Sequence, residues 1–212
     1  MTEFEKQFRE VQELLEFNDF NQTIKRVIDF TLDTENIDFY TKTNEFLNWL
    51  DHNEKEDEDK KTRLKTLLDE LHAFLSKKEC HNHQTIISVK NLQKVYNASF
   101  GLGPINLDIK TGEIIGLVGE NGNGKTTLLR SLCGELHPTS GTINYQFQYD
   151  DLYDLRTKLV YIPQRTDTWR GSMYENLEFT ASCYGYSPEE NNLVVDLVIT
   201  RLGLRKFRKH YW

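Results

Sequence analysis

The sequence predicts an all-α segment of four helices followed by an α/β segment that is built around a phosphate-binding loop. Two observations lead to this prediction. Residues 119–127 read GENGNGKTT, which fits the pattern of a glycine, four residues and then Gly-Lys-Thr. Apolar residues recur at helical spacing up to about residue 79, and short β runs begin at residue 85. We therefore expect a helical module at 1–79, a linker at 80–85 and an α/β domain at 86–212.

The first 79 residues contain four amphipathic stretches. In the first, at 3–17, Phe4, Phe8, Val11 and Leu15 fall on one helical face. Further helices are expected at about 20–32 and 35–51, and a fourth follows a charge-dense connector at 51–61. Its inner face would carry Leu64, Leu67, Leu68, Leu71 and Leu75. Two antiparallel hairpins fit this order. The module is either a docking or regulatory element or a solvated bundle that only extends the domain.

The linker contains metal-binding residue types. Cys80, His81 and His83, with His72 as a fourth ligand, could hold a metal ion, but their spacing matches no familiar zinc pattern. A polar linker is the simpler interpretation.

Charge is unevenly distributed along the chain. Residues 1–84 hold 12 Lys/Arg and 20 Asp/Glu, a balance of −8, whereas the whole chain carries −7. An acidic front half argues against nucleic acid or anionic lipid as a direct partner. Cys80, Cys133 and Cys183 are scattered and odd in number, which indicates reduced thiols in a cytoplasmic protein. No signal segment follows Met1, and no apolar run is long enough to span a membrane.

The flanks of the loop fit a phosphate site. Residues 113–118 have the length and composition of a strand, and residues 127–133 are typical of a helix. Glycines let the backbone approach an anion, and successive N–H groups at a helix N-terminus then face it. Lys125 would add a positive charge near the β and γ phosphates, and the Thr126 hydroxyl could ligate Mg²⁺. The alternative is a glycine-rich turn without a ligand.

The strands and turns around this loop resemble the nucleotide-binding domain of ATP-binding cassette (ABC) proteins. The matching segments, which cover about residues 86–212, are Val95-Tyr96, 106–113, 119–127, Pro138 to Ile143, Leu159 to Gln164 and Glu175-Asn176-Leu177. The resemblance implies an α/β P-loop NTPase fold of the ABC type, here truncated at its C-terminal side. It also implies ATP and Mg²⁺ as cofactors.

The resemblance assigns roles to individual residues. Tyr96 matches the aromatic residue that stacks on adenine; its alternative is a strand tyrosine that packs on the sheet. Gln164 matches the glutamine that reaches Mg²⁺ and the attacking water, and otherwise it is an ordinary residue at a strand end. Thr126 and Gln164 are thus the expected magnesium ligands. The expected nucleotide-binding residues in the loop are Gly119, Glu120, Asn121, Gly122, Asn123, Gly124, Lys125, Thr126 and Thr127.

Several family elements do not occur among the 212 residues. These are the signature loop, the second acidic strand with its catalytic glutamate, and the later histidine. Asp150, Asp151 and Asp154 lie in a predicted turn, and Asp196 is predicted to be on a helix face, so none replaces the missing metal-binding aspartate. The simplest interpretation is a truncated chain that binds ATP without hydrolysing it.

The function implied by the resemblance is that of an ATP-binding subunit of a transporter. Its partners would be transmembrane subunits and a second ABC ATPase domain, in a homodimer or heterodimer. The chain would lie in the cytoplasm at the inner face of the membrane through those subunits. Two alternatives remain open, namely a soluble ABC ATPase that acts on ribosomes or nucleic acid, and a regulatory protein that binds nucleotide.

Overall fold

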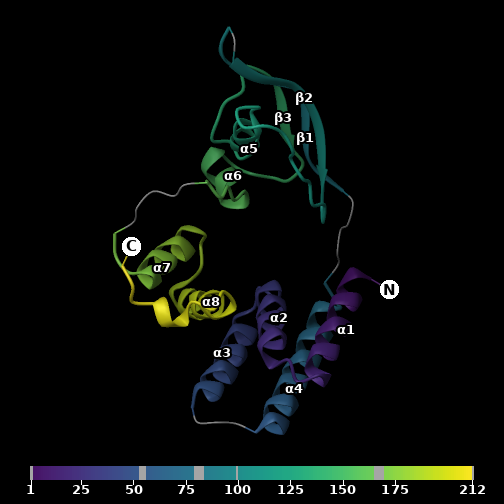
Figure 1. Cartoon of the computed structure of the whole chain (residues 1–212), viewed down its shortest axis with the longest axis vertical. Helices are drawn as coiled ribbons and strands as arrows, with labels where there is room; N and C mark the ends of the chain where they lie inside the picture. The colour runs from purple at the N-terminus through teal and green to yellow at the C-terminus, as the bar shows by residue number, and fades with distance from the viewer. Residues whose placement is uncertain (1, 53–55, 79–83, 99, 165–169, 212) are drawn as a thin grey trace. The chain divides into compact units, whose positions relative to one another are not determined.

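The computed structural model describes residues 2–52, 56–78, 84–98, 100–164 and 170–211. The chain divides into two compact units (Figure 1). One unit combines Met1–Glu79 with Asp167–Trp212, and the other is Cys80–Thr166.

The first unit contains the four predicted N-terminal helices. They are α1 (Glu3–Glu16), α2 (Phe20–Asp33), α3 (Ile37–Asp51) and α4 (Asp57–Leu75). The first three begin where the side chains of Thr2, Asp19 and Asn36 accept hydrogen bonds from backbone N–H groups of the first turn. The prediction of four helices is confirmed, and the end of the charged connector belongs to the first turns of α4.

Two further helices of this unit come from the other end of the chain. They are α7 (Met173–Cys183) and α8 (Pro188–Arg201), followed by a 3₁₀ turn at Arg205–Phe207. Ser172 and Glu175 form a capping box at the start of α7, and Ser187 and Glu190 form another at the start of α8. Each pair satisfies N–H groups that a helix start leaves without intrahelical partners.

The core of the first unit joins residues that are distant in the sequence. Apolar side chains of α1 to α4, including Val11, Ile28, Leu64 and Leu68, form one buried cluster with Val194 and Leu197 of α8. Packing of amphipathic faces, rather than intrinsic helix propensity, supplies most of the stability of such short helices. The domain boundaries expected from the sequence stay a prediction, but the described packing links helices from both sides of residues 80–85.

The second unit contains a three-stranded antiparallel sheet in the order β2-β1-β3. The strands are β1 (Thr85–Asn97), β2 (Phe100–Lys110) and β3 (Ser140–Tyr145), and the helices are α5 (Lys125–Leu132) and α6 (Leu152–Lys158). Leu128 and Leu132 of α5 pack with Val89, Leu92 and Leu102 of the sheet. This contact fixes the helix that follows the phosphate-binding loop.

Three local expectations differ from the structure. The segments 113–118 and 159–164 are not strands. Ile114 and Val118 are 98 % and 99 % exposed. A strand needs a neighbouring strand to pair its backbone, and neither segment joins the β2-β1-β3 sheet.

The region of Asp150 to Asp154 is also different, because it contains the short helix α6 rather than only a turn. Asp151 caps this helix by accepting hydrogen bonds from the backbone N–H groups of Tyr153 and Asp154.

Candidate nucleotide-binding site

The phosphate-binding loop leads directly into α5. Gly122 and Gly124 have φ values of 91° and 79°, in the left-handed region that favours glycine. A Cβ atom at Gly124 would lie 2.7 Å from Cδ1 of Leu102. The loop therefore requires glycine at position 124, both for the backbone conformation and for the close approach of the loop to β2.

Lys125, the first residue of α5, turns its ammonium group back to the loop. Nζ donates hydrogen bonds to the carbonyl oxygen atoms of Gly119, at 2.6 Å, and Glu120, at 2.8 Å. An ammonium group has three donors, so these two bonds leave one for another acceptor. The positive charge is thus held at the loop, beside the N-terminus of an eight-residue helix. Both features favour an anion at this position.

A cavity of about 390 Å³ opens beside the loop. Its lining residues are Phe100, Asn121, Gly122, Gly124, Lys125, Thr126, Thr127 and Gln164. The volume lies in the range typical of small-molecule sites. The structure thus brings Gln164 to the same cavity as most of the predicted loop residues. Gly119 and Glu120 contribute the carbonyl groups that bind Lys125, and the Asn123 N–H donates to the Glu120 carbonyl oxygen at 3.3 Å.

Tyr96 does not line this cavity, but Phe100 does, and the two rings are neighbours. Their centroids are 5.5 Å apart with an interplanar angle of 30°. The Tyr96 hydroxyl lies 3.4 Å from Oγ1 of Thr127, and Nζ of Lys94 lies 5.8 Å from the Tyr96 ring centroid. Asn97 pairs with Phe100 where β1 turns into β2, which places the two aromatic residues side by side. Sequence reasoning missed Phe100, although an aromatic residue close after Tyr96 was the available signal.

The cavity also gathers oxygen donors that suit Mg²⁺. Thr126 and Gln164 both line it, and hydroxyl and amide carbonyl oxygens are ligands of the kind that Mg²⁺ takes in proteins. Among the residues that the structure describes, no group of three or more His, Cys, Asp or Glu is arranged to hold a metal ion.

The other residues considered as metal ligands lie outside the described residues or have other partners. Cys80, His81 and His83 lie outside the described residues. His72 contacts Glu5 through Nε2 at 3.1 Å. A hydrogen bond from Lys158 lowers the pKa of Asp154, and both residues of this ion pair belong to α6 and do not line the cavity.

Asp196 lies on α8 and forms an ion pair with Arg208, which confirms its prediction as a helix-face residue. In the described part of the chain, no helix is both long enough and apolar enough to cross a membrane.

Comparisons with known proteins show which family this chain resembles. Residues 102–212 match the family model ABC_tran, described as ABC transporter. The methionine import ATP-binding protein MetN 1 of Acinetobacter baylyi is 35 % identical over 130 residues, which are 56 % of this chain and 36 % of that protein. The probable multidrug ABC transporter ATP-binding protein YbhF of Escherichia coli is 29 % identical over 144 residues, or 66 % of this chain and 25 % of that protein.

A solved structure described as the ATP-binding subunit of an ABC transporter is also similar. It has a TM-score of 0.53 and 25 % identity, and the match covers 60 % of this chain and 54 % of that chain. The chain spans about a quarter to little more than a third of the length of the two curated relatives. The fold is that of an ABC nucleotide-binding domain, joined to a helical module that lies before the matched residues. Because the family model covers more than half of its residues, the chain belongs to the ABC transporter family.

Proposed function

We propose that this chain supplies the ATP-binding part of an ABC transporter and that ATP with Mg²⁺ occupies the cavity beside the phosphate-binding loop. The observation that supports the proposal most directly is the set of residues around that cavity. Two glycines with positive φ, the Lys125 ammonium group, the Thr126 hydroxyl and the Gln164 amide all belong to it.

The phosphates would bind at the loop. Backbone N–H groups of the glycine-rich segment and the N-terminus of α5 offer donors and a partial positive charge. Lys125 would contribute its remaining donor, or exchange a loop carbonyl for a phosphate oxygen, which is the stronger acceptor. Mg²⁺ would neutralise phosphate charge while it is held by Thr126 and Gln164.

The adenine base would pack on the aromatic pair. Phe100 lines the cavity and Tyr96 lies against Phe100. An aromatic ring and a base both offer a flat π surface, and stacking of this kind is worth about 1–3 kcal/mol per base. We propose that both rings, rather than Tyr96 alone, form the surface on which adenine rests.

The transport role rests on the relatives. MetN 1 and YbhF are named as ATP-binding proteins of import and multidrug transport systems. We propose by similarity that this chain acts with transmembrane subunits and a second ATP-binding domain at the cytoplasmic face of a membrane. The names of the relatives differ in substrate and direction, so neither is assigned to this chain.

Titration with a fluorescent ATP analogue in the presence of Mg²⁺ tests the binding site. Lys125→Ala removes a charge-assisted contact worth about 1.5–3 kcal/mol, so affinity should fall about tenfold or more. Lys110→Ala is the matched control, because Lys110 is an exposed lysine of the same unit that does not line the cavity. Its affinity should equal that of the unchanged protein. Equal affinities for all three proteins would contradict the proposed site.

A further inference from the structure

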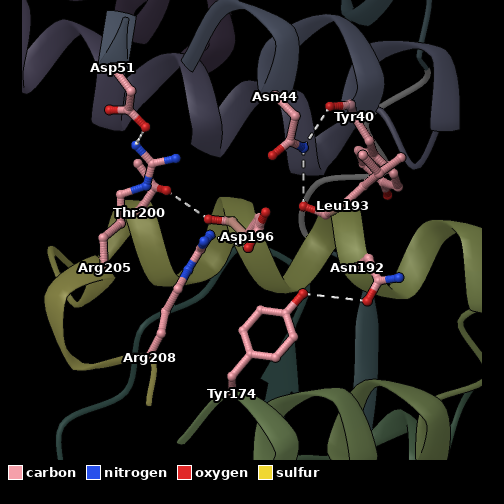
Figure 2. Close-up of polar contacts among 10 residues, drawn as sticks. All are labelled: Tyr40, Asn44, Asp51, Tyr174, Asn192, Leu193, Asp196, Thr200, Arg205 and Arg208. Carbon is pink, nitrogen blue, oxygen red and sulfur yellow. Dashed lines mark hydrogen bonds and ion pairs between the residues drawn. The ribbon is translucent and has the colours of Figure 1, made fainter. Parts of the chain in front are cut away.

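Helix α8 lies between two partners within the first unit. Figure 2 shows α3 on one side of α8 and Tyr174 of α7 on the other. The residues of α8 fall inside the family match at 102–212, whereas α1 to α4 lie before it. Helices from outside the family match therefore pack against a helix from inside it.

The apolar residues of α8 form two separate faces. Val194 and Leu197 are buried in the cluster built by α1 to α4, and Leu193 and Val198 pack against that cluster. Val195 and Ile199 instead belong to a cluster with Met173 and Ala181 of α7. Leu197 and Ile199 are both 0 % exposed. A helix that is buried on both faces needs a neighbour on each, and the four-helix module is the neighbour on one of them.

Polar contacts secure the module to the first half and to the end of α8. In its second turn, Nδ2 of Asn44, a residue that is 8 % exposed, donates to the carbonyl oxygen of Leu193 at 3.2 Å (Figure 2). The same nitrogen also donates to the Tyr40 carbonyl oxygen at 2.8 Å. At its end, Arg201 donates to both carboxylate oxygens of Asp29, at 2.6 and 3.0 Å.

Just beyond α8, Arg205 forms an ion pair with Asp51 at 2.5 Å (Figure 2). The bidentate geometry of the Arg201–Asp29 pair fixes the register of the two helices as well as their contact. Two carboxylates of the acidic N-terminal half, Asp29 and Asp51, thus pair with arginines at the end of α8 and just after it. Charge complementarity of this kind selects a partner and an orientation.

We infer that the face formed by α2 and α3 is a dedicated binding surface for α8, and that the module and α8 form one rigid body. A displacement of α8 then carries the module with it, and a partner that binds the module acts on α8. This inference goes beyond the proposed ATP-binding function and does not depend on it. It also distinguishes a docked module from a bundle that is connected to the rest of the chain only through the linker at 80–85.

Hydrogen–deuterium exchange of the full 212-residue chain tests this surface. In the unchanged protein, amides of α8 should be protected to the same degree as those of α2, because both open in one cooperative step. Asp29→Arg and Arg201→Asp each place like charges together and remove two charge-assisted hydrogen bonds. Each should accelerate exchange in α8 about tenfold or more. The double variant, in which the two charges are exchanged, should recover part of the protection. Recovery is incomplete because the positive charge at position 29 then lies beside Arg26, which pairs with Asp29 at 3.7 Å in the unchanged protein.

A matched control breaks an ion pair that does not involve α8. Lys42→Gln removes the exposed contact of Lys42 with Glu70, which joins α3 to α4 at 2.5 Å, and should leave exchange in α8 unchanged. Arg201→Lys keeps the charge but loses the bidentate geometry, and should accelerate exchange in α8 less than Arg201→Asp does.

The inference is overturned if α8 exchanges equally fast in the unchanged protein and in both reversed variants. It is also overturned if the double variant is no better protected than the single ones while helical circular dichroism is retained. ATP-analogue affinity is measured on the same samples. If the charge-reversed variants keep their affinity for the ATP analogue but lose protection of α8, this surface acts independently of the nucleotide site. If Lys125→Ala fails to weaken binding, the proposed nucleotide site is contradicted, but the exchange result for α8 still stands.

Discussion

Replacement of Leu197 by alanine should destabilise the first unit strongly. Leu197 is 0 % exposed and belongs to the cluster formed with α1 to α4. The substitution removes about three buried carbon atoms, which at ~0.8 kcal/mol each is ~2.4 kcal/mol of lost transfer free energy. The cavity left behind adds to this, so the expected loss of unfolding free energy is about 3–5 kcal/mol. That is a large part of the roughly 5–15 kcal/mol that a typical domain has.

Urea denaturation of the full chain, followed by helical circular dichroism, measures this loss. With a slope of about 2 kcal/mol per molar urea, the midpoint of the helical transition should fall by about 1.5 M or more. Leu202→Ala is the control, because Leu202 follows α8 and is 60 % exposed. Its effect should stay within about 0.5 kcal/mol. If both variants shifted the midpoint by the same small amount, α8 would not be buried against the module and our reasoning would fail.

Two further predictions concern the aromatic pair and the module. Tyr96→Ala and Phe100→Ala should each weaken binding of the ATP analogue by about 1–3 kcal/mol, whereas Tyr96→Phe should change it little; equal weakening by Tyr96→Ala and Tyr96→Phe would assign the effect to the hydroxyl instead of the ring. A fragment of residues 1–79 should give a helical circular dichroism spectrum and a cooperative melt, because its apolar stripes face one another. Since the fragment lacks α8, its melting temperature should be lower than that of the full chain when both are followed by helical circular dichroism. A random-coil spectrum would show that the module needs α8 to fold.

The turn of the glycine-rich loop into α5 and the N-terminal helices could be predicted because their determinants are local. Gly124 and Lys125 are specified by a short motif whose geometry depends on adjacent residues. The helices of the module follow from apolar spacing over three or four turns. Helix α6 was missed because it has only seven residues and buries only Leu155. An apolar periodicity does not emerge over so short a length.

The features that could not be predicted depend on contacts between distant residues. The segment 113–118 has a strand-like composition, but pairing with another strand is a property of the sheet and not of the segment. Phe100 became a candidate only when the β1–β2 hairpin placed it at the cavity. The apolar sequence of α8 indicates that the helix is buried on several sides. It does not reveal that α3, which contains Asn44 about 150 residues earlier in the chain, covers one of these sides.

The burial of α8 on two sides has an evolutionary consequence. Positions 194 and 197 face the module, whereas 195 and 199 face α7. A family member without the four N-terminal helices would leave the first pair without this neighbour, so we expect selection there not to maintain the same apolar residues. Members that carry the helices should keep positions 194 and 197 apolar. In those members, a change of charge at position 29 should be accompanied by the opposite change at position 201, as in two subunits that have evolved together.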